Sequence, residues 1–141
     1  MRGFRPKHFE LRELVTPEIY AARGEAAWEL LDPRGLIVLE AVREKFGPCT
    51  VNNWHAGGAY KESGLRDAAT GTGARYSQHK RGGAYDTKYR DASPREVFDY
   101  LLEHADEFPE LTVIEDIEAT PSWIHLDVRN ASWTGIRVVK P

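Results

Sequence analysis

The order in which helix and strand signals follow one another along this chain constrains its fold more than any other feature. Three segments carry an N-cap residue followed by proline at the first helical position, which is a strong helix-start signal; they are Thr16-Pro17-Glu18, Asp32-Pro33 and Ser93-Pro94-Arg95-Glu96. Strand-like apolar segments follow the last of them, at 111–114, 123–128 and 136–139. Helices that precede clustered strands indicate an α+β domain, with a small antiparallel sheet flanked by about three helices.

The length and charge of the chain fit one ordinary globular domain. Its 141 residues suffice for a single core, so we expect one domain over residues 1–141. The net charge of -3 gives no broad basic footprint for nucleic acid. No apolar run approaches the ~18 residues of a membrane-spanning helix, and no apolar run follows the basic N-terminal residues as in a signal peptide. We therefore expect a monomer made in the cytoplasm, without membrane insertion or a nucleic-acid partner.

The middle of the chain predicts a short strand, a long loop and a second strand. Cys49 is the single cysteine and excludes a disulfide within the chain or a cysteine-rich zinc cluster. It precedes a strand-like segment, Thr50–Trp54, and we interpret it as a small buried side chain. Residues 55–76 hold five of the 12 glycines and little periodicity, which predicts a long loop of the kind that is often functional. A strand-like segment at 84–88 follows the Gly82-Gly83 break.

Two of the five histidines have an aspartate nearby in a strand-like context. Gly82 and Gly83 lie between His79 and Asp86 and allow a tight turn, so the two side chains can face one point. His125 and Asp127 are two residues apart in a strand-like segment and share one of its faces. Histidine and carboxylate ligands are typical of catalytic zinc sites, which keep three protein ligands and one open position. This pattern alone leaves open whether the histidines bind metal or only pack in the fold.

The segment from Ser77 to Asp86 reads S-x-H-x-x-G-x-A-x-D, and Trp123-Ile124-His125-Leu126-Asp127 follows it downstream. These two motifs, in this order and with a helix between them, resemble the zinc D-Ala-D-Ala carboxypeptidase family. That superfamily includes vancomycin-resistance D,D-dipeptidases, phage endolysins and the hedgehog signalling domain. The resemblance covers roughly residues 8 to 130, and the layout is similar to a compact phage or prophage branch.

The resemblance implies specific roles for individual residues. His79, Asp86 and His125 match the three ligands of one zinc ion, and Ser77 matches the motif serine, whose hydroxyl orients the site. Ser63-Gly64-Leu65-Arg66 resembles the family's S-G-Y-R stretch, with leucine in place of the aromatic residue. The resemblance implies that Arg66 meets a substrate carboxylate, for which a planar guanidinium is suited. Gly82 and Ala84 match small positions beside the metal loop.

The general base is the point at which the chain departs from the family pattern. Many members carry an acidic residue three positions before the last zinc ligand, where this chain has Ser122. A serine is not an efficient base at neutral pH without help. Asp127, two residues after His125, is our first candidate for the base, and Glu115 is the second; a structural role for Asp127 stays open.

The resemblance implies a zinc peptidase that hydrolyses a D-amino-acid-containing bond of a peptidoglycan stem peptide. The activity would be that of a D,D-carboxypeptidase, an L-alanyl-D-glutamate endopeptidase or an endolysin, released to the cell wall by another factor. The alternative is a catalytically silent metal-binding module, or a phage structural module with the same fold, which Ser122 favours.

Overall fold

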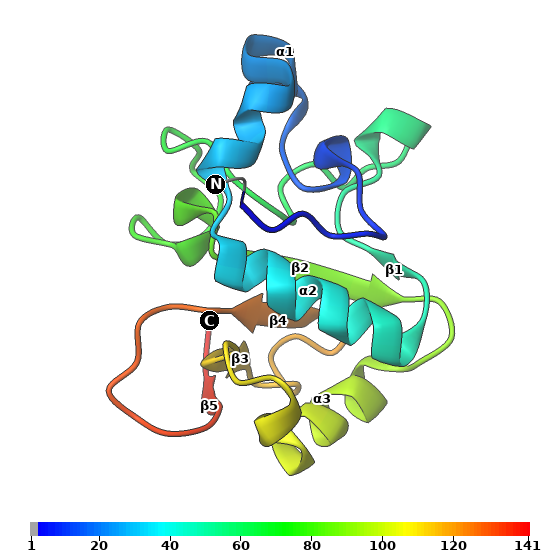
Figure 1. Cartoon of the computed structure of the whole chain (residues 1–141), viewed down its shortest axis with the longest axis vertical. Coiled ribbons are helices and arrows are strands. Elements are labelled where there is room, and N and C mark those ends of the chain that lie inside the picture. The colour runs from blue at the N-terminus through cyan, green and yellow to red at the C-terminus, as the bar shows by residue number, and fades with distance from the viewer. Residues whose placement is uncertain (1–2) are drawn as a thin grey trace.

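The computed structural model describes residues 3–141, in which helices pack against a five-stranded sheet (Figure 1). The α-helices are α1 (Pro17–Arg23), α2 (Pro33–Phe46) and α3 (Pro94–Glu103). The strands are β1 (Cys49–Thr50), β2 (Ala84–Tyr89), β3 (Val113–Glu115), β4 (Ile124–Asp127) and β5 (Arg137–Val139). Helices and strands contribute to one hydrophobic core, so the predicted single α+β domain is confirmed.

The three helix starts lie where the sequence predicts them. The Thr16 hydroxyl accepts the amide of Ile19, and the Ser93 hydroxyl accepts the amide of Glu96 in a capping box. The first helix is short, because α1 ends at Arg23. Gly24 has a positive φ of 55°, which ends the α-helix, and the segment Gly24–Leu30 continues as a 3-10 helix.

The strand order is β1-β2-β4-β3-β5, and three of the four pairings are antiparallel. The fourth pairing, between β3 and β5, is parallel and departs from the purely antiparallel expectation. The cause lies in the connection: after β4 the chain reverses, passes β3 and pairs with its outer edge. A chain that returns antiparallel to β4 necessarily runs parallel to β3.

Helix α2 crosses one face of β2 and β4 (Figure 1) and leaves part of the other face free for polar side chains. Gly35 allows this close packing, since a Cβ at that position would lie 3.2 Å from the ring of Tyr85. Tyr85 pairs with Leu126 in the ladder, and both are buried in the core. Their neighbours Asp86 and His125 therefore point to the opposite face.

The predicted strand at Thr50–Trp54 is limited to β1, while the long loop after it is present. The buried amide of Asn52 ends the strand, because its Nδ2 donates to the carbonyl of Val15 and its Oδ1 accepts the amide of Ser63. Trp54 begins a short 3-10 helix, Trp54–Ala56. The loop then runs to a 3-10 helix at Gln78–Arg81 (η4). Within residues 3–141, none of the helices has the length and apolar character needed to traverse a lipid bilayer.

Candidate metal centre

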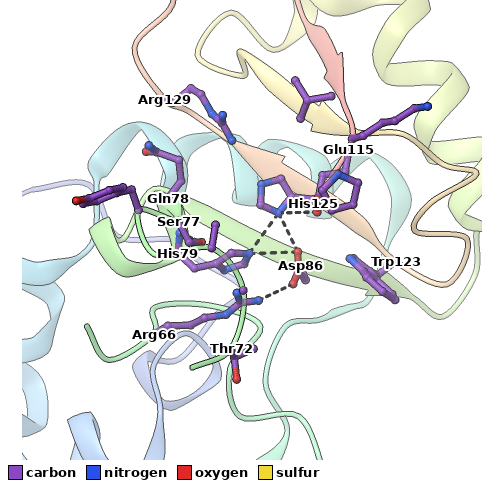
Figure 2. Close-up of a pocket in the computed structure, with 16 residues that line it drawn as sticks. Arg66, Thr72, Ser77, Gln78, His79, Asp86, Glu115, Trp123, His125 and Arg129 are labelled. Carbon is purple, nitrogen blue, oxygen red and sulfur yellow. Dashed lines mark hydrogen bonds and ion pairs between the residues drawn. The ribbon is translucent and has the colours of Figure 1, made fainter. Parts of the chain in front are cut away.

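Three donor atoms from three separate elements converge in one cleft (Figure 2). His79 comes from η4, Asp86 from β2 and His125 from β4. His79 Nε2 lies 3.2 Å from His125 Nδ1 and 3.3 Å from Asp86 Oδ1, and His125 Nδ1 lies 3.0 Å from Asp86 Oδ1. The three side chains are only 3%, 14% and 8% exposed for His79, Asp86 and His125, respectively.

The position of His79 is fixed by the residues on either side of it. The Ser77 hydroxyl caps η4 by accepting the amide of His79, so the motif serine orients this histidine through its backbone. Gly82 ends η4 with a φ of 72°, a left-handed conformation that favours glycine. A Cβ on Gly82 would lie 2.1 Å from the carbonyl oxygen of Leu30, so no side chain fits at this position.

The long loop supplies the acceptor that orients the His79 ring. His79 Nδ1 lies 2.9 Å from the carbonyl oxygen of Gly64, which can only accept, so Nδ1 carries the hydrogen. The lone pair of Nε2 is then free to face Asp86 and His125. Gly64 reaches this place by packing directly on the backbone of Leu14, where an added Cβ would approach the Leu14 carbonyl oxygen to 2.3 Å.

The sheet register brings Asp86 and His125 together, because they are direct partners across β2 and β4. Burial acts to raise the pKa of Asp86, but the hydrogen bonds and charges of His125 and His79 outweigh it and hold this pKa well below its usual range. Burial acts to lower the pKa of His125, whereas Asp127 and Asp86 raise it to about 9. A metal ion that binds here therefore displaces a proton from His125.

Asp127 lies behind His125 and orients it. His125 Nε2 donates to Asp127 Oδ2 at 3.0 Å, which leaves Nδ1 facing the cleft. Asp127 is fully buried, and the guanidinium and backbone amide of Arg129 also donate hydrogen bonds to its carboxylate. Burial acts to raise the pKa of Asp127, but the contacts with His125 and Arg129 outweigh it, so this pKa lies below its usual value. A carboxylate enclosed in this way does not fit the first-choice assignment of Asp127 as general base.

Glu115 lies on the cleft side of the cluster, at the end of β3. Its Oε1 is 3.2 Å from His125 Nδ1, and its side chain is 14% exposed. Ser122, at the position where the family pattern has an acid, is exposed in the turn before β4 and is not part of the cleft wall. Of the two sequence-predicted candidates, Glu115 is therefore the one whose carboxylate faces both the donor atoms and the cleft.

Arg66 enters the cleft from the long loop. Its Nη2 donates to Asp86 Oδ2 at 3.2 Å, and its Nε donates to the carbonyl of Glu62 at 2.7 Å. The Glu62 carboxylate in turn accepts the hydroxyls of Thr70 and Thr72, so the loop is folded around it. Arg66 thus supports the carboxylate of Asp86 on the side away from the histidines, and its guanidinium also faces the cleft.

The cleft itself has a volume of about 470 Å³ and brings together all but one of the predicted site residues. Arg66, Ser77, His79, Asp86, Glu115 and His125 line it, whereas Asp127 is buried beneath. The cleft wall also contains residues to which the sequence motifs assign no role: Thr72, Tyr76, Gln78, Arg129 and Lys140. The sequence does carry a signal for the contact between Arg129 and Asp127, because these two residues have the same i, i+2 spacing as His125 and Asp127.

The three donors fit the demands of a zinc ion. Zinc prefers nitrogen and carboxylate ligands at ~2.0–2.1 Å in a tetrahedron, which separates ligand atoms by about 3.3–3.4 Å. The observed separations of 3.0 to 3.3 Å are close to that value. Each histidine also has its second ring nitrogen held by an acceptor, as ligand histidines commonly do. A second group of possible donors, His8, Glu40 and Glu44, has two exposed members.

No family model, curated protein or solved structure matches this chain.

Proposed function

We propose that this protein is a zinc-dependent peptidase that hydrolyses a D-amino-acid-containing bond in a peptidoglycan stem peptide. The observation that carries the proposal is the convergence of His79, Asp86 and His125, the three ligands implied by the motif resemblance, beside the Glu115 carboxylate in an open cleft. This donor set leaves a fourth position for chemistry.

A bound zinc ion supplies Lewis acidity, which polarises a scissile carbonyl and lowers the pKa of water to about 7. Glu115 is the proposed general base: its carboxylate accepts a proton from the attacking water and returns it to the leaving nitrogen. Such proton transfer typically contributes ~10²–10⁴-fold in rate. Asp127 holds His125 in the tautomer that presents Nδ1, and Arg129 holds Asp127.

Arg66 is the proposed contact for a substrate carboxylate, because its guanidinium faces the cleft next to the ligands. The Ser77 hydroxyl hydrogen is available to a substrate acceptor, since its oxygen already accepts the amide of His79. Both residues would orient the peptide rather than take part in bond making.

A second candidate function is a catalytically silent metal-binding module, including a phage structural module. It is favoured by Ser122, which replaces an acid of the family pattern and lies outside the cleft. Glu115 argues against it, because a carboxylate from the neighbouring strand lies 3.2 Å from a proposed ligand.

Mass spectrometry of peptidoglycan fragments tests the proposal directly. Purified fragments of several wall chemistries are incubated with zinc-loaded protein, with chelator-treated protein and with the zinc-loaded Glu115→Gln variant. We expect a defined peptide bond to be lost only with the zinc-loaded native protein. Bound zinc without cleavage of any fragment would overturn the peptidase and favour the silent module.

A further inference from the structure

Cationic side chains line the cleft on both sides of the metal-ligand cluster. Arg66 lies on one side of His79, Asp86 and His125, and Arg129 lies on the other (Figure 2). Lys140, just beyond β5, is a third cation of the cleft wall. It is exposed and makes no ion pair with any residue of the described range 3–141.

Both arginines are fixed in place and still have unused donors. A guanidinium has five N–H groups. Arg129 uses Nε and Nη2 for the carboxylate of Asp127, and Arg66 uses Nε for the Glu62 carbonyl and Nη2 for Asp86. Neither Nη1 donates to an acceptor among residues 3–141. The backbone of Gly73 packs next to Arg66 Nη1, where the Cβ of a larger residue would lie 2.6 Å from that nitrogen and crowd it.

This arrangement suits the binding of carboxylates at two separate places. A guanidinium binds carboxylate in a planar, two-pronged geometry, and charge-assisted hydrogen bonds are about twice as strong as neutral ones. Because ion pairs with Asp86 and Asp127 already hold the guanidiniums of Arg66 and Arg129, little side-chain freedom is lost when a ligand binds. Lys140 adds positive charge to the cleft, and a ligand need not displace an acidic partner among residues 3–141 to bind it.

We infer that the cleft selects a peptide with two carboxylates, one held by Arg66 and the other by Arg129 together with Lys140, on opposite sides of the ligand cluster. The inference deepens the proposed function and rests on it for the peptide class. In a wall stem peptide, a γ-linked D-glutamate leaves its α-carboxylate free, and the C-terminal residue supplies the second carboxylate.

Four fluorescently labelled tetrapeptides test this inference. The first is L-Ala-γ-D-Glu-L-Lys-D-Ala; the others carry D-isoglutamine in place of D-glutamate, a C-terminal amide, or both changes. Stopped-flow anisotropy measures binding to the zinc-loaded protein within seconds, and mass spectrometry of the same samples measures cleavage. We expect each amide to weaken binding about tenfold, because it replaces a charged carboxylate and so removes a charge-assisted hydrogen bond to a cationic side chain of the cleft.

Two lysine variants assign the effect to the cleft. Lys140→Gln should reduce the preference for one of the two carboxylates severalfold and leave the other unchanged, whereas Lys7→Gln, which removes the same charge outside the cleft, should change neither. Four peptides that bind equally, none that binds, or equal effects of both variants would overturn the inference. If the protein prefers the carboxylate peptides but cleaves none, the inference stands and the proposed peptidase activity is wrong. If it cleaves the peptides without a preference, the peptidase activity stands and the inference is wrong.

Discussion

Asp86 and His125 lie directly opposite each other in the β2–β4 ladder, and Asp86 Oδ1 is 3.0 Å from His125 Nδ1. Two donors on adjacent strands are held at this distance by the backbone of the sheet rather than by flexible loops. His79 completes the group from η4, whose orientation depends on Ser77 and Gly82. The rigid part of the site therefore comes from the sheet, and the part contributed by loops is fixed by hydrogen bonds.

Removal of a histidine ligand should abolish stoichiometric zinc binding. His79→Ala and His125→Ala each remove one of three donors. The loss of zinc affinity should therefore exceed the ~10–100-fold that is typical when a residue that only hydrogen-bonds to a ligand is replaced. Isothermal titration with zinc measures the affinity. His104→Ala is the matched control, because His104 stacks on Tyr100 at the end of α3, away from the cleft. Near-native affinity in both ligand variants would sink the metal assignment.

Substitution of Glu115 should separate metal binding from turnover. Glu115→Gln keeps the size of the side chain but removes the base, so we expect native zinc affinity and a ~10²–10⁴-fold loss of kcat. Zinc titration and peptide hydrolysis on the same protein measure the two effects. A Glu115→Gln enzyme with full turnover would move the base elsewhere.

Asp127→Asn distinguishes an orienting residue from a base. The asparagine no longer offers a full carboxylate to His125 Nε2 and Arg129, so zinc affinity should fall by about 10–100-fold. Because the base is retained, saturating zinc should restore most of the turnover. If turnover stays lost when zinc is fully bound, Asp127 is the base after all. Arg129→Ala should resemble Asp127→Asn in weakening zinc.

The sequence is sufficient to predict the helix starts and the convergence of His79, Asp86 and His125. Those features depend on local signals: the N-caps at Thr16 and Ser93, and the motif spacing from His79 to Asp86. The choice between Asp127 and Glu115 depended on strand register instead. The i, i+2 rule puts Asp127 on the face of His125 and Arg129 on the face of Asp127, but the burial of the Asp127 carboxylate beneath the cleft depends on three-dimensional packing.

The parallel pairing of β5 and the support of His79 by Gly64 also lay beyond sequence reasoning. Both join residues far apart in the chain, and no local pattern specifies a nonlocal pairing or a backbone acceptor. The long loop was predicted as functional from its glycines. The Ser63-Gly64-Leu65-Arg66 stretch already indicates Arg66 as a site residue, whereas the carbonyl that Gly64 offers to His79 and the bond from Arg66 to Asp86 depend on how the loop folds around Glu62.

Gly82→Ala should destabilise the fold and the site together. The substitution places a side chain at a φ of 72° and a Cβ 2.1 Å from the Leu30 carbonyl oxygen, so the turn must shift. The left-handed conformation alone costs about 1–2 kcal/mol, and the clash adds to it. Urea denaturation measures the change in the free energy of unfolding. Gly71→Ala is the control, because its added Cβ meets no atom within 4 Å; equal stability of the two variants would contradict the role of Gly82.

Cys49 should make the folded protein less stable as the pH rises above about 8.5. Burial, only partly offset by contacts with Tyr89 and Lys88, raises the pKa of the Cys49 thiol to about 12, against about 8.5 in an unfolded chain. The folded state thus holds this proton more tightly, and the stabilisation is complete below the unfolded pKa and is lost as pH rises toward the folded one. At pH 10 the loss amounts to about 2 kcal/mol from this group. Urea denaturation of the native protein and of Cys49→Ala at pH 8 and pH 10 measures the combined effect of the thiol and of its contact with Tyr89, whose pKa Cys49 also raises. An identical pH dependence of the two proteins would show that the thiol is not shielded in the folded state.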